Sequence, residues 1–435
     1  PLLQDLASGD FEEVQLVKSS SIMFLRATGQ APPADQEADR SITDLRTAST
    51  PEGPPILCLL DGYPAANHPL LDGRVVVFDP DDLESDSSVG ERKHGTWMAS
   101  AAVWGDLGDP ARRPAARPVL VRPILAPSTE TTSRVEEVPA TELVPDFMWR
   151  VFRELFEDGD GRRAAAPDVV IVNLSVADPS TPFDSIVSSW ARIIDWLSYH
   201  YGVLVVVSAG NQPRLPLGPN TAQSFTALHG EDRRQALLDA QMADRIHRRL
   251  LSPAESINAL TVGSVHMDHS GPIPHGYIED PTDGLLCISP VTSIGGGYRR
   301  SAKPELAAPG GKVVYPTPIV DSDQVVFRQG SASGPGIRVA HPSGAETFTS
   351  GTSPAAALVS RQAARLHDEL DRITNGVPLT RRQRAVAIKA LLAHGASTLD
   401  GVGFDHPVIA MAVGNGVLAR DFSEGCAANE AVVLY

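Results

Sequence analysis

Residues 349–357 read Thr349-Ser350-Gly351-Thr352-Ser353-Pro354-Ala355-Ala356-Ala357, a serine directly before a proline and a run of small residues. Taken alone, this stretch predicts the start of a helix, with Ser353 as the N-cap and Pro354 at the first helical position. The helix is expected to run over 354–371. A serine in this position lies beside the positive end of the helix dipole, which favours negative charge.

Three other segments place polar side chains at the ends of apolar runs. They are Leu59-Leu60-Asp61-Gly62, His94-Gly95-Thr96-Trp97-Met98-Ala99 and Val206-Val207-Ser208-Ala209-Gly210-Asn211. Each has an ordinary structural explanation: an aspartate opening a turn, a capping or core histidine, and a strand that ends in a turn. Their common feature is a position at a strand end or a helix start.

From residue 55 onward, short β-branched runs alternate with longer helical stretches, a pattern typical of a parallel sheet covered by helices. The expected strands are 56–60, 75–78, 119–124, 169–174, 204–208, 259–265 and 312–314. The expected helices are 94–104, 144–156, 185–199, 232–250, 354–371 and 380–394. We therefore predict a three-layer α/β/α fold with a mainly parallel central sheet.

The domain organisation predicted from this pattern is simple. One domain covers 55–425, preceded by a mostly irregular N-terminal extension (1–54) and followed by a short tail (426–435). Two stretches are interpreted as insertions: 212–250, a Pro-rich loop with a charged helix, and 321–347, a Gly-rich hairpin with arms at 325–328 and 336–340.

In an open α/β sheet the carboxyl ends of the strands meet at one edge, so the four segments are expected to converge there. The chain order Asp61, His94, Ser353 is that of subtilisin and differs from the orders in chymotrypsin and the α/β-hydrolases. Further motifs agree: His68-Pro69-Leu70 after the aspartate, Asn173-Leu174-Ser175-Val176, Ala259-Leu-Thr-Val-Gly-Ser264 and Lys303-Pro-Glu-Leu-Ala-Ala-Pro-Gly310. The chain thus resembles the subtilisin-like serine proteases, or subtilases, from about residue 55 to about residue 421.

The resemblance implies a serine endopeptidase with a triad of Asp61, His94 and Ser353. It also implies an oxyanion hole formed by the Asn211 side chain and the Ser353 N–H, and no required cofactor. The substrate is expected to lie along Ser175-Val176-Ala177-Asp178 and Ala209-Gly210. Trp97, Pro354 and Ala357 depart from the family motifs without removing a functional group.

Asp178 stands where the family usually has a glycine. One interpretation places its carboxylate at the wall of the P1 pocket, favouring Arg or Lys. The other makes Asp178 a turn cap before Pro179, away from substrate. The sequence leaves both open.

The composition bears on the partners and the cellular compartment of the protein. Lys and Arg number 37 against 53 Asp and Glu, a formal net charge of −16, which disfavours nucleic acid and anionic membranes as partners. The unpaired cysteines Cys58, Cys287 and Cys426 and the absence of a visible signal peptide favour a cytoplasmic protein. A secreted protein stays open as the alternative, because the sequence begins at Pro1 and not at Met.

Two expectations concern regulation and metal binding. A regulatory partner or a further N-terminal domain would control the protease, and a pseudoprotease that binds peptides without cleaving them is the alternative. The acidic run Asp79, Asp81, Asp82, Glu84 and Asp86 could hold a structural calcium ion, although a solvated acidic loop is the simpler interpretation.

Overall fold

The computed structural model of the chain describes residues 49–128, 134–159, 161–273, 276–330, 333–374, 376–398 and 405–418. Most of the predicted N-terminal extension and all of the predicted tail lie outside these residues.

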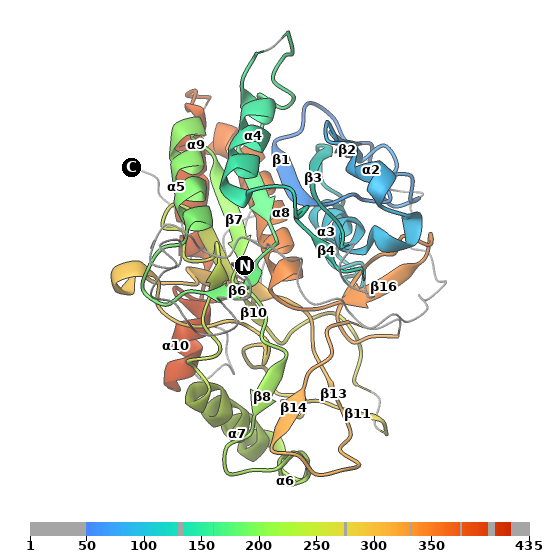
Figure 1. Cartoon of the computed structure of the whole chain (residues 1–435), viewed down its shortest axis with the longest axis vertical. Coiled ribbons are helices and arrows are strands. Elements are labelled where there is room, and N and C mark those ends of the chain that lie inside the picture. Colours follow the sequence, from blue (N-terminus) through green and yellow to red (C-terminus); the bar gives the residue numbers. More distant parts are fainter. Residues whose placement is uncertain are drawn as a thin grey trace, which may run out of the picture.

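The centre of the molecule is a mainly parallel sheet with the order β12-β10-β7-β5-β1-β3-β2 (Figure 1). The strands are β1 (Leu57–Gly62), β2 (Val75–Val77), β3 (Val119–Pro127), β5 (Ile171–Leu174), β7 (Leu204–Ser208), β10 (Leu260–Val265) and β12 (Leu306–Pro309). A short antiparallel strand, β4 (Glu136–Glu137), pairs with the end of β3. The predicted strand at 312–314 is wrong, because the last parallel strand is β12, which lies earlier in the chain.

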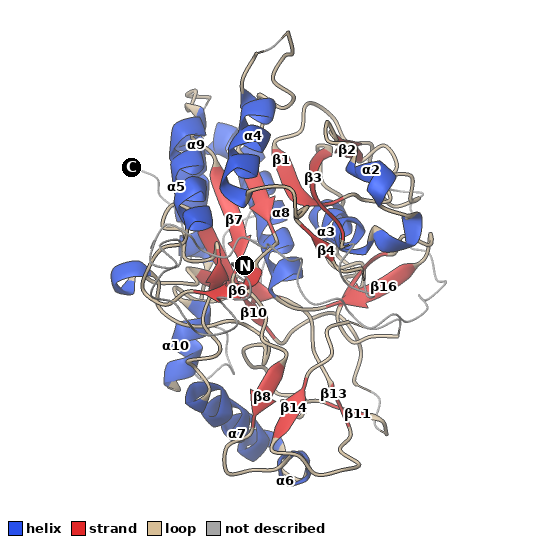
Figure 2. Ribbon diagram, viewed as in Figure 1, coloured by secondary structure: helices blue, strands red, loops and turns tan. Residues whose placement is uncertain are grey.

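Helices cover both faces of this sheet (Figure 2). On one face, α3 (Lys93–Trp104), α8 (Thr352–Ile373) and α9 (Arg381–Gly395) share a buried apolar cluster with Leu57 and Leu59 of β1. On the other, α4 (Val144–Phe156) and α5 (Ser189–Tyr201) share a cluster with Cys58 and Leu60. Successive residues of a strand face opposite sides, so the continuous apolar run of β1 is buried on both sides, as the three-layer prediction requires.

The two predicted insertions pair with each other. In the first lie β8 (Arg214–Pro216), α6 (Ala222–Thr226) and α7 (Gly230–Ala243); in the second lies β14 (Gln324–Val326), which is antiparallel to β8. The predicted hairpin between 325–328 and 336–340 is therefore wrong. Val325 and Leu215 lie opposite each other and are both buried, whereas β15 (Ile337–Ala340) pairs with β16 (Glu346–Thr349) across a tight turn.

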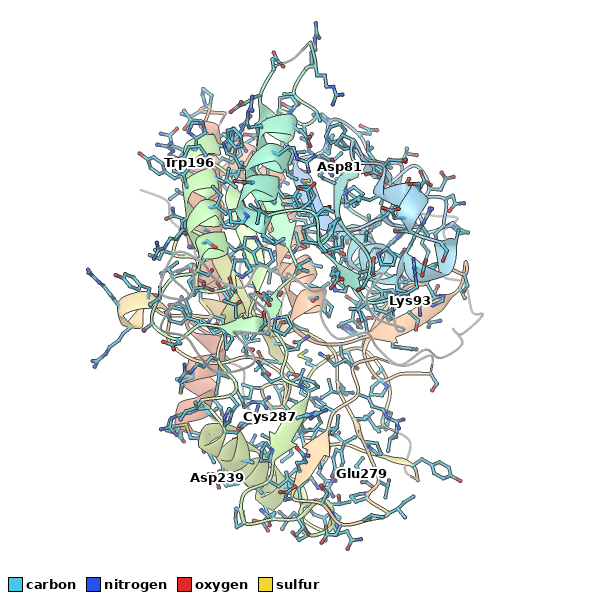
Figure 3. The ribbon with its side chains drawn as sticks, viewed as in Figure 1. Asp81, Lys93, Trp196, Asp239, Glu279 and Cys287 are labelled. Carbon is cyan, nitrogen blue, oxygen red and sulfur yellow. The ribbon has the colours of Figure 1, made fainter. Side chains whose placement is uncertain are left out.

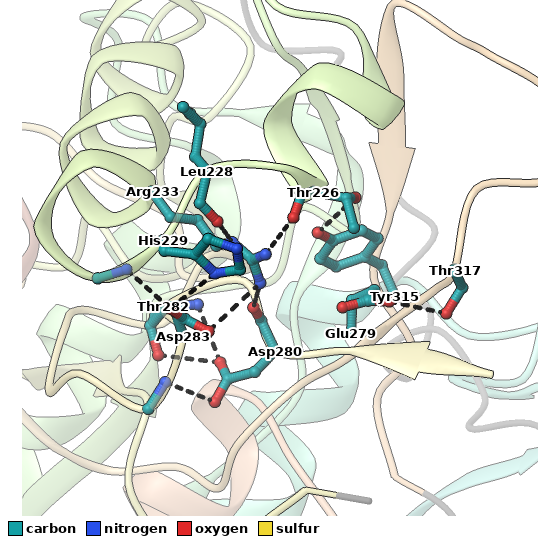
Figure 4. A network of polar contacts seen from close by, with 12 residues as sticks. Thr226, Leu228, His229, Arg233, Glu279, Asp280, Thr282, Asp283, Tyr315 and Thr317 are labelled. Carbon is teal, nitrogen blue, oxygen red and sulfur yellow. Dashed lines mark hydrogen bonds and ion pairs between the residues drawn. The ribbon is translucent and has the colours of Figure 1, made fainter. Parts of the chain in front are cut away.

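A network of buried polar contacts beside α7 is centred on Arg233 of that helix (Figure 4). Its guanidinium is 3% exposed and donates to the carbonyl oxygens of Leu228 at 2.7 Å, Asp280 at 2.9 Å and Thr226. Tyr315 joins the network through its hydroxyl, 3.0 Å from that of Thr226. One buried cation thus satisfies three carbonyls, two at and just after the end of α6 and one at Asp280.

The remaining elements are short: α2 (Leu83–Asp86), η1 (Val89–Glu91), β6 (Asp178–Pro182), β9 (Leu251–Ser252), β11 (Ile278–Glu279), η2 (Tyr298–Arg300), β13 (Tyr315–Pro316) and α10 (Pro407–Val413). None of the described helices is both long and apolar enough to span a bilayer. Cys58 and Cys287 are buried free thiols, and burial raises the pKa of each to about 12. Figure 3 shows Cys287 where the sheet meets the inserted region.

Candidate active site

A buried aspartate and a histidine meet at the carboxyl end of β1. Asp61 lies in this strand and is fully buried, and His94 is the second residue of α3. The Nδ1 atom of His94 lies 2.7 Å from Asp61 Oδ1, which also accepts a hydrogen bond from the Gly62 N–H at 2.7 Å. His94 Nε2 has no hydrogen-bond partner among the described residues. The carboxylate therefore fixes the ring and leaves its far nitrogen available.

The electrostatics of His94 follow from two opposing causes. Burial lowers the pKa of the imidazole, but the carboxylates of Asp61 and Glu136 outweigh it, so the pKa lies above its ordinary value. The imidazolium form is consequently stabilised at this position.

Ser353 lies at the start of α8, on the same edge of the sheet. Gly351 is the N-cap of this helix and Ser353 is its second residue, so the predicted capping role for Ser353 is wrong. Ser353 is buried, 3% exposed as a residue, and its hydroxyl donates to the Ser175 carbonyl oxygen at 3.1 Å. In return the Ser175 hydroxyl donates to the Ser353 carbonyl oxygen, also at 3.1 Å. The segment that follows β5 and the start of α8 are thus in direct contact.

Asn211 faces the same helix start from the loop after β7. Its Oδ1 accepts hydrogen bonds from the backbone N–H and the hydroxyl of Thr352, both at 3.0 Å. Gly351 has φ +127, and a Cβ atom there would lie 2.5 Å from Asn211 Nδ2. The amide is therefore oriented through its oxygen, and its nitrogen lies against a residue that can have no side chain.

The predicted substrate-binding segments lie on either side of this helix start. Ser175, Val176 and Ala177 are buried after β5, and the Gly210 N–H donates to the Thr352 hydroxyl at 3.2 Å. Ala209 accepts a hydrogen bond from the Leu251 N–H at 3.1 Å. Hydrogen bonds thus join four segments that are far apart in the sequence: the segment after β5, the loop after β7, Leu251 and the start of α8.

Asp178 caps a turn. Its Oδ1 accepts from the Ser180 N–H at 2.8 Å and the Ser180 hydroxyl at 2.6 Å, and its Oδ2 accepts from the Thr181 hydroxyl at 2.7 Å. The side chain is 3% exposed. Of the two interpretations left open by the sequence, the geometry matches the turn cap.

Glu136 of β4 was not expected at this site. Its Oε2 accepts a hydrogen bond from the His94 backbone N–H at 2.9 Å. Burial raises the pKa of Glu136 to about 7, His94 opposes this rise and Asp61 adds to it. The sequence signal for it is weak, a Glu-Glu pair between two valines.

Three carboxylates of the acidic run after β2 are engaged by other groups of the protein. Asp79 accepts from the N–H groups of Leu83 and Glu84, Asp81 pairs with Arg122 and Arg150, and Glu84 pairs with Arg92. Figure 3 labels Asp81 in this region. No cluster of three or more His, Cys, Asp or Glu side chains arranged to hold a metal occurs in the described part of the chain.

An Asp–His pair, a helix-start serine and an amide thus lie at the carboxyl edge of a parallel sheet, which is where sites form in α/β folds. The Subtilase family model matches residues 54–416. The chain therefore belongs to the subtilase family, whose members are serine peptidases.

Individual relatives are distant. The chain is 30% identical over 153 residues to the uncharacterized protein y4bN of Sinorhizobium fredii (strain NBRC 101917 / NGR234), a match covering 33% of this chain and 31% of that protein. It therefore spans about a third of the length of that curated relative. Among solved structures, it is similar to the prenylagaramide maturation protease PagA (18% identity, 84% and 90% of the two chains, TM-score 0.47). It is also similar to the patellamide maturation protease PatA, with 19% identity, coverage of 84% of this chain and 94% of that chain, and a TM-score of 0.47.

Proposed function

We propose that the protein is a serine endopeptidase that uses Asp61, His94 and Ser353 as its triad. The observation that carries the proposal is the 2.7 Å contact between Asp61 and His94 Nδ1, with His94 Nε2 unpartnered among the described residues. A serine hydroxyl is a weak nucleophile that needs such a base. Membership of the subtilase family supports the same assignment.

In this mechanism the Ser353 hydroxyl turns from the Ser175 carbonyl toward His94 Nε2, which takes its proton as Oγ attacks the scissile carbonyl carbon. Asp61 holds Nδ1–H and stabilises the imidazolium without itself taking the proton. The oxyanion accepts hydrogen bonds from Asn211 Nδ2 and the Ser353 backbone N–H. His94 then protonates the leaving amine, and water releases the acyl group by the reverse sequence.

A second candidate function is peptide binding without cleavage. The observation that favours it is the hydrogen bond from the Ser353 hydroxyl to Ser175 instead of His94. Active-site hydrogen bonds often form only with substrate present, so this geometry is compatible with the peptidase as well.

The two functions are separated by incubating an unfolded protein substrate with the wild type and with Ser353→Ala, and sequencing the products by mass spectrometry. The peptidase predicts internal cleavage by the wild type alone. Binding of the substrate by both proteins without any fragments would contradict the proposal and favour the binding module.

A further inference from the structure

Two carboxylates lie at the start of α3, that of Asp61 in β1 and that of Glu136 in β4. Antiparallel pairing of Glu137 with Ala126, and of Glu136 with Pro127, brings β4 to the carboxyl end of β3. Arg92, at the N-cap of α3, makes no capping hydrogen bond through its side chain. The carboxylate of Glu136 supplies an acceptor there instead, 2.9 Å from the His94 N–H.

Two glycines make this approach feasible. A Cβ atom at Gly62 would lie 1.9 Å from Glu136 Oε1, and one at Gly95 would lie 2.1 Å from the Gly62 carbonyl oxygen. Neither position can hold a side chain without moving backbone or carboxylate. Glu136, Gly62 and the first turn of α3 are therefore in close mutual contact, and the carboxylate is fixed relative to the histidine.

Among the described residues, the charged groups that shift the pKa of Glu136 are His94, Asp61 and Lys93. Two carboxylates thus contact His94, Asp61 at the Nδ1 atom of the imidazole and Glu136 at the backbone N–H. A positive charge on the ring is attracted by Asp61, and by Glu136 above about pH 7, where the Glu136 carboxylate is mostly ionised.

We infer that Glu136 is a positioning residue for the proposed peptidase reaction: it fixes the His94 backbone at the start of α3 and stabilises the imidazolium by its charge. The inference rests on the proposed function for its kinetic consequence. Its electrostatic part, the coupling between Glu136 and His94, is independent of catalysis.

Removing the negative charge of Glu136 makes protonation of His94 harder, so the pKa of His94 falls. The acid limb of kcat/KM then moves to lower pH, because His94 acts as a base only when neutral. The imidazolium formed in the transition state also loses an attractive charge, so kcat falls while KM is little changed.

The test compares Glu136→Gln, which retains an oxygen acceptor for the His94 N–H, with Glu137→Gln, which removes a neighbouring charge on the same strand. For Glu136→Gln we expect kcat to fall roughly tenfold and the acid limb to move down by about 0.5–1 pH unit. Glu136→Asp keeps the charge and should restore the position of the limb. Glu137→Gln should match the wild type in both respects.

The His94 imidazole is titrated in parallel by NMR in the Ser353→Ala background, with His94→Ala identifying its signal. We expect Glu136→Gln to lower this pKa as well. An unchanged His94 pKa and an unchanged pH profile in an active enzyme would overturn the inference and leave the peptidase proposal intact. A lowered His94 pKa in a protein whose wild type cleaves nothing would contradict the peptidase proposal and support the electrostatic coupling.

Discussion

Gly351 lies against the Asn211 amide so closely that one added methyl group, in Gly351→Ala, should displace that amide and lower kcat. In Gly351→Ala the new Cβ would lie 2.5 Å from Asn211 Nδ2 and 2.8 Å from Gln329 Nε2. Non-bonded heavy atoms prefer separations of about 3.5–4.0 Å, so Asn211 has to give way by roughly 1 Å. Its oxygen is held by Thr352 at 3.0 Å, so the movement turns the amide nitrogen away from the position proposed for the oxyanion.

Loss of one oxyanion donor lowers kcat by about 10²–10³. The backbone adds a second cost, because Gly351 has φ +127 and ψ −166, a region essentially confined to glycine. Alanine there lowers the free energy of unfolding by about 1–3 kcal/mol. We therefore expect Gly351→Ala to fold, to be less stable, and to lose kcat with only a small change in KM.

Gly295→Ala is the matched control, since Gly295 also has φ +127 but nothing lies within 4 Å of its Cβ position. It should lose comparable stability and keep its kcat, as measured by denaturant unfolding and by steady-state hydrolysis of a chromogenic peptide. If Gly351→Ala keeps the wild-type kcat while losing stability as Gly295→Ala does, the proposed role of the Asn211 amide is refuted.

Three further predictions follow from named contacts. Asn211→Leu should lower kcat by about 10²–10³ with KM nearly constant, and a loss seen wholly in KM would make Asn211 a ground-state contact. Arg122 is fully buried and pairs with Asp81 and Glu154, so Arg122→Met should reduce the free energy of unfolding by about 3–5 kcal/mol. Arg150→Met removes a cation that is 38% exposed from the same Asp81 and should cost about 0–1 kcal/mol. Burial raises the pKa of Asp81, but Arg122 and Arg150 outweigh it and hold the pKa below its ordinary value. The stabilisation from ionised Asp81 is present above about pH 4 and is lost as pH falls through the folded-state pKa of Asp81. The difference in free energy of unfolding between the wild type and Arg122→Met should therefore shrink in acid. Equal losses in the two Arg variants would contradict this account. Asp178→Gly should leave the P1 preference on a peptide panel unchanged while lowering the melting temperature, and a changed preference would show that the carboxylate faces substrate after all.

The sequence predicts a feature well when a local pattern specifies it, such as a polar residue at a strand end or a helix start. The rule that strand ends and helix starts share one edge of a parallel sheet predicts two contacts that the structure shows, His94 with Asp61 and Asn211 with the start of α8 next to Ser353. The helix of 144–156 and the strand of 204–208 have the predicted bounds, because a long amphipathic or a short wholly apolar run specifies its own element.

The remaining features depend on contacts between distant segments. The pairing of β14 with β8 joins residues about a hundred positions apart, and no local pattern distinguishes it from the hairpin that was expected. Glu136 reaches His94 only because two glycines allow the backbones to touch, and the N-cap of α8 is Gly351 because the chain enters with positive φ. Such features follow from the close approach of backbones and not from periodicity.

The central claim is that Ser353 is a nucleophile activated by His94. The most direct measurement is reaction with a fluorophosphonate probe, followed by peptide mapping of the adduct. We predict one adduct, on Ser353, in the wild type and in the neighbouring control Ser350→Ala, and none in Ser353→Ala or His94→Ala. Equal labelling of the wild type and Ser353→Ala, or no labelling of the folded wild type, would contradict the claim.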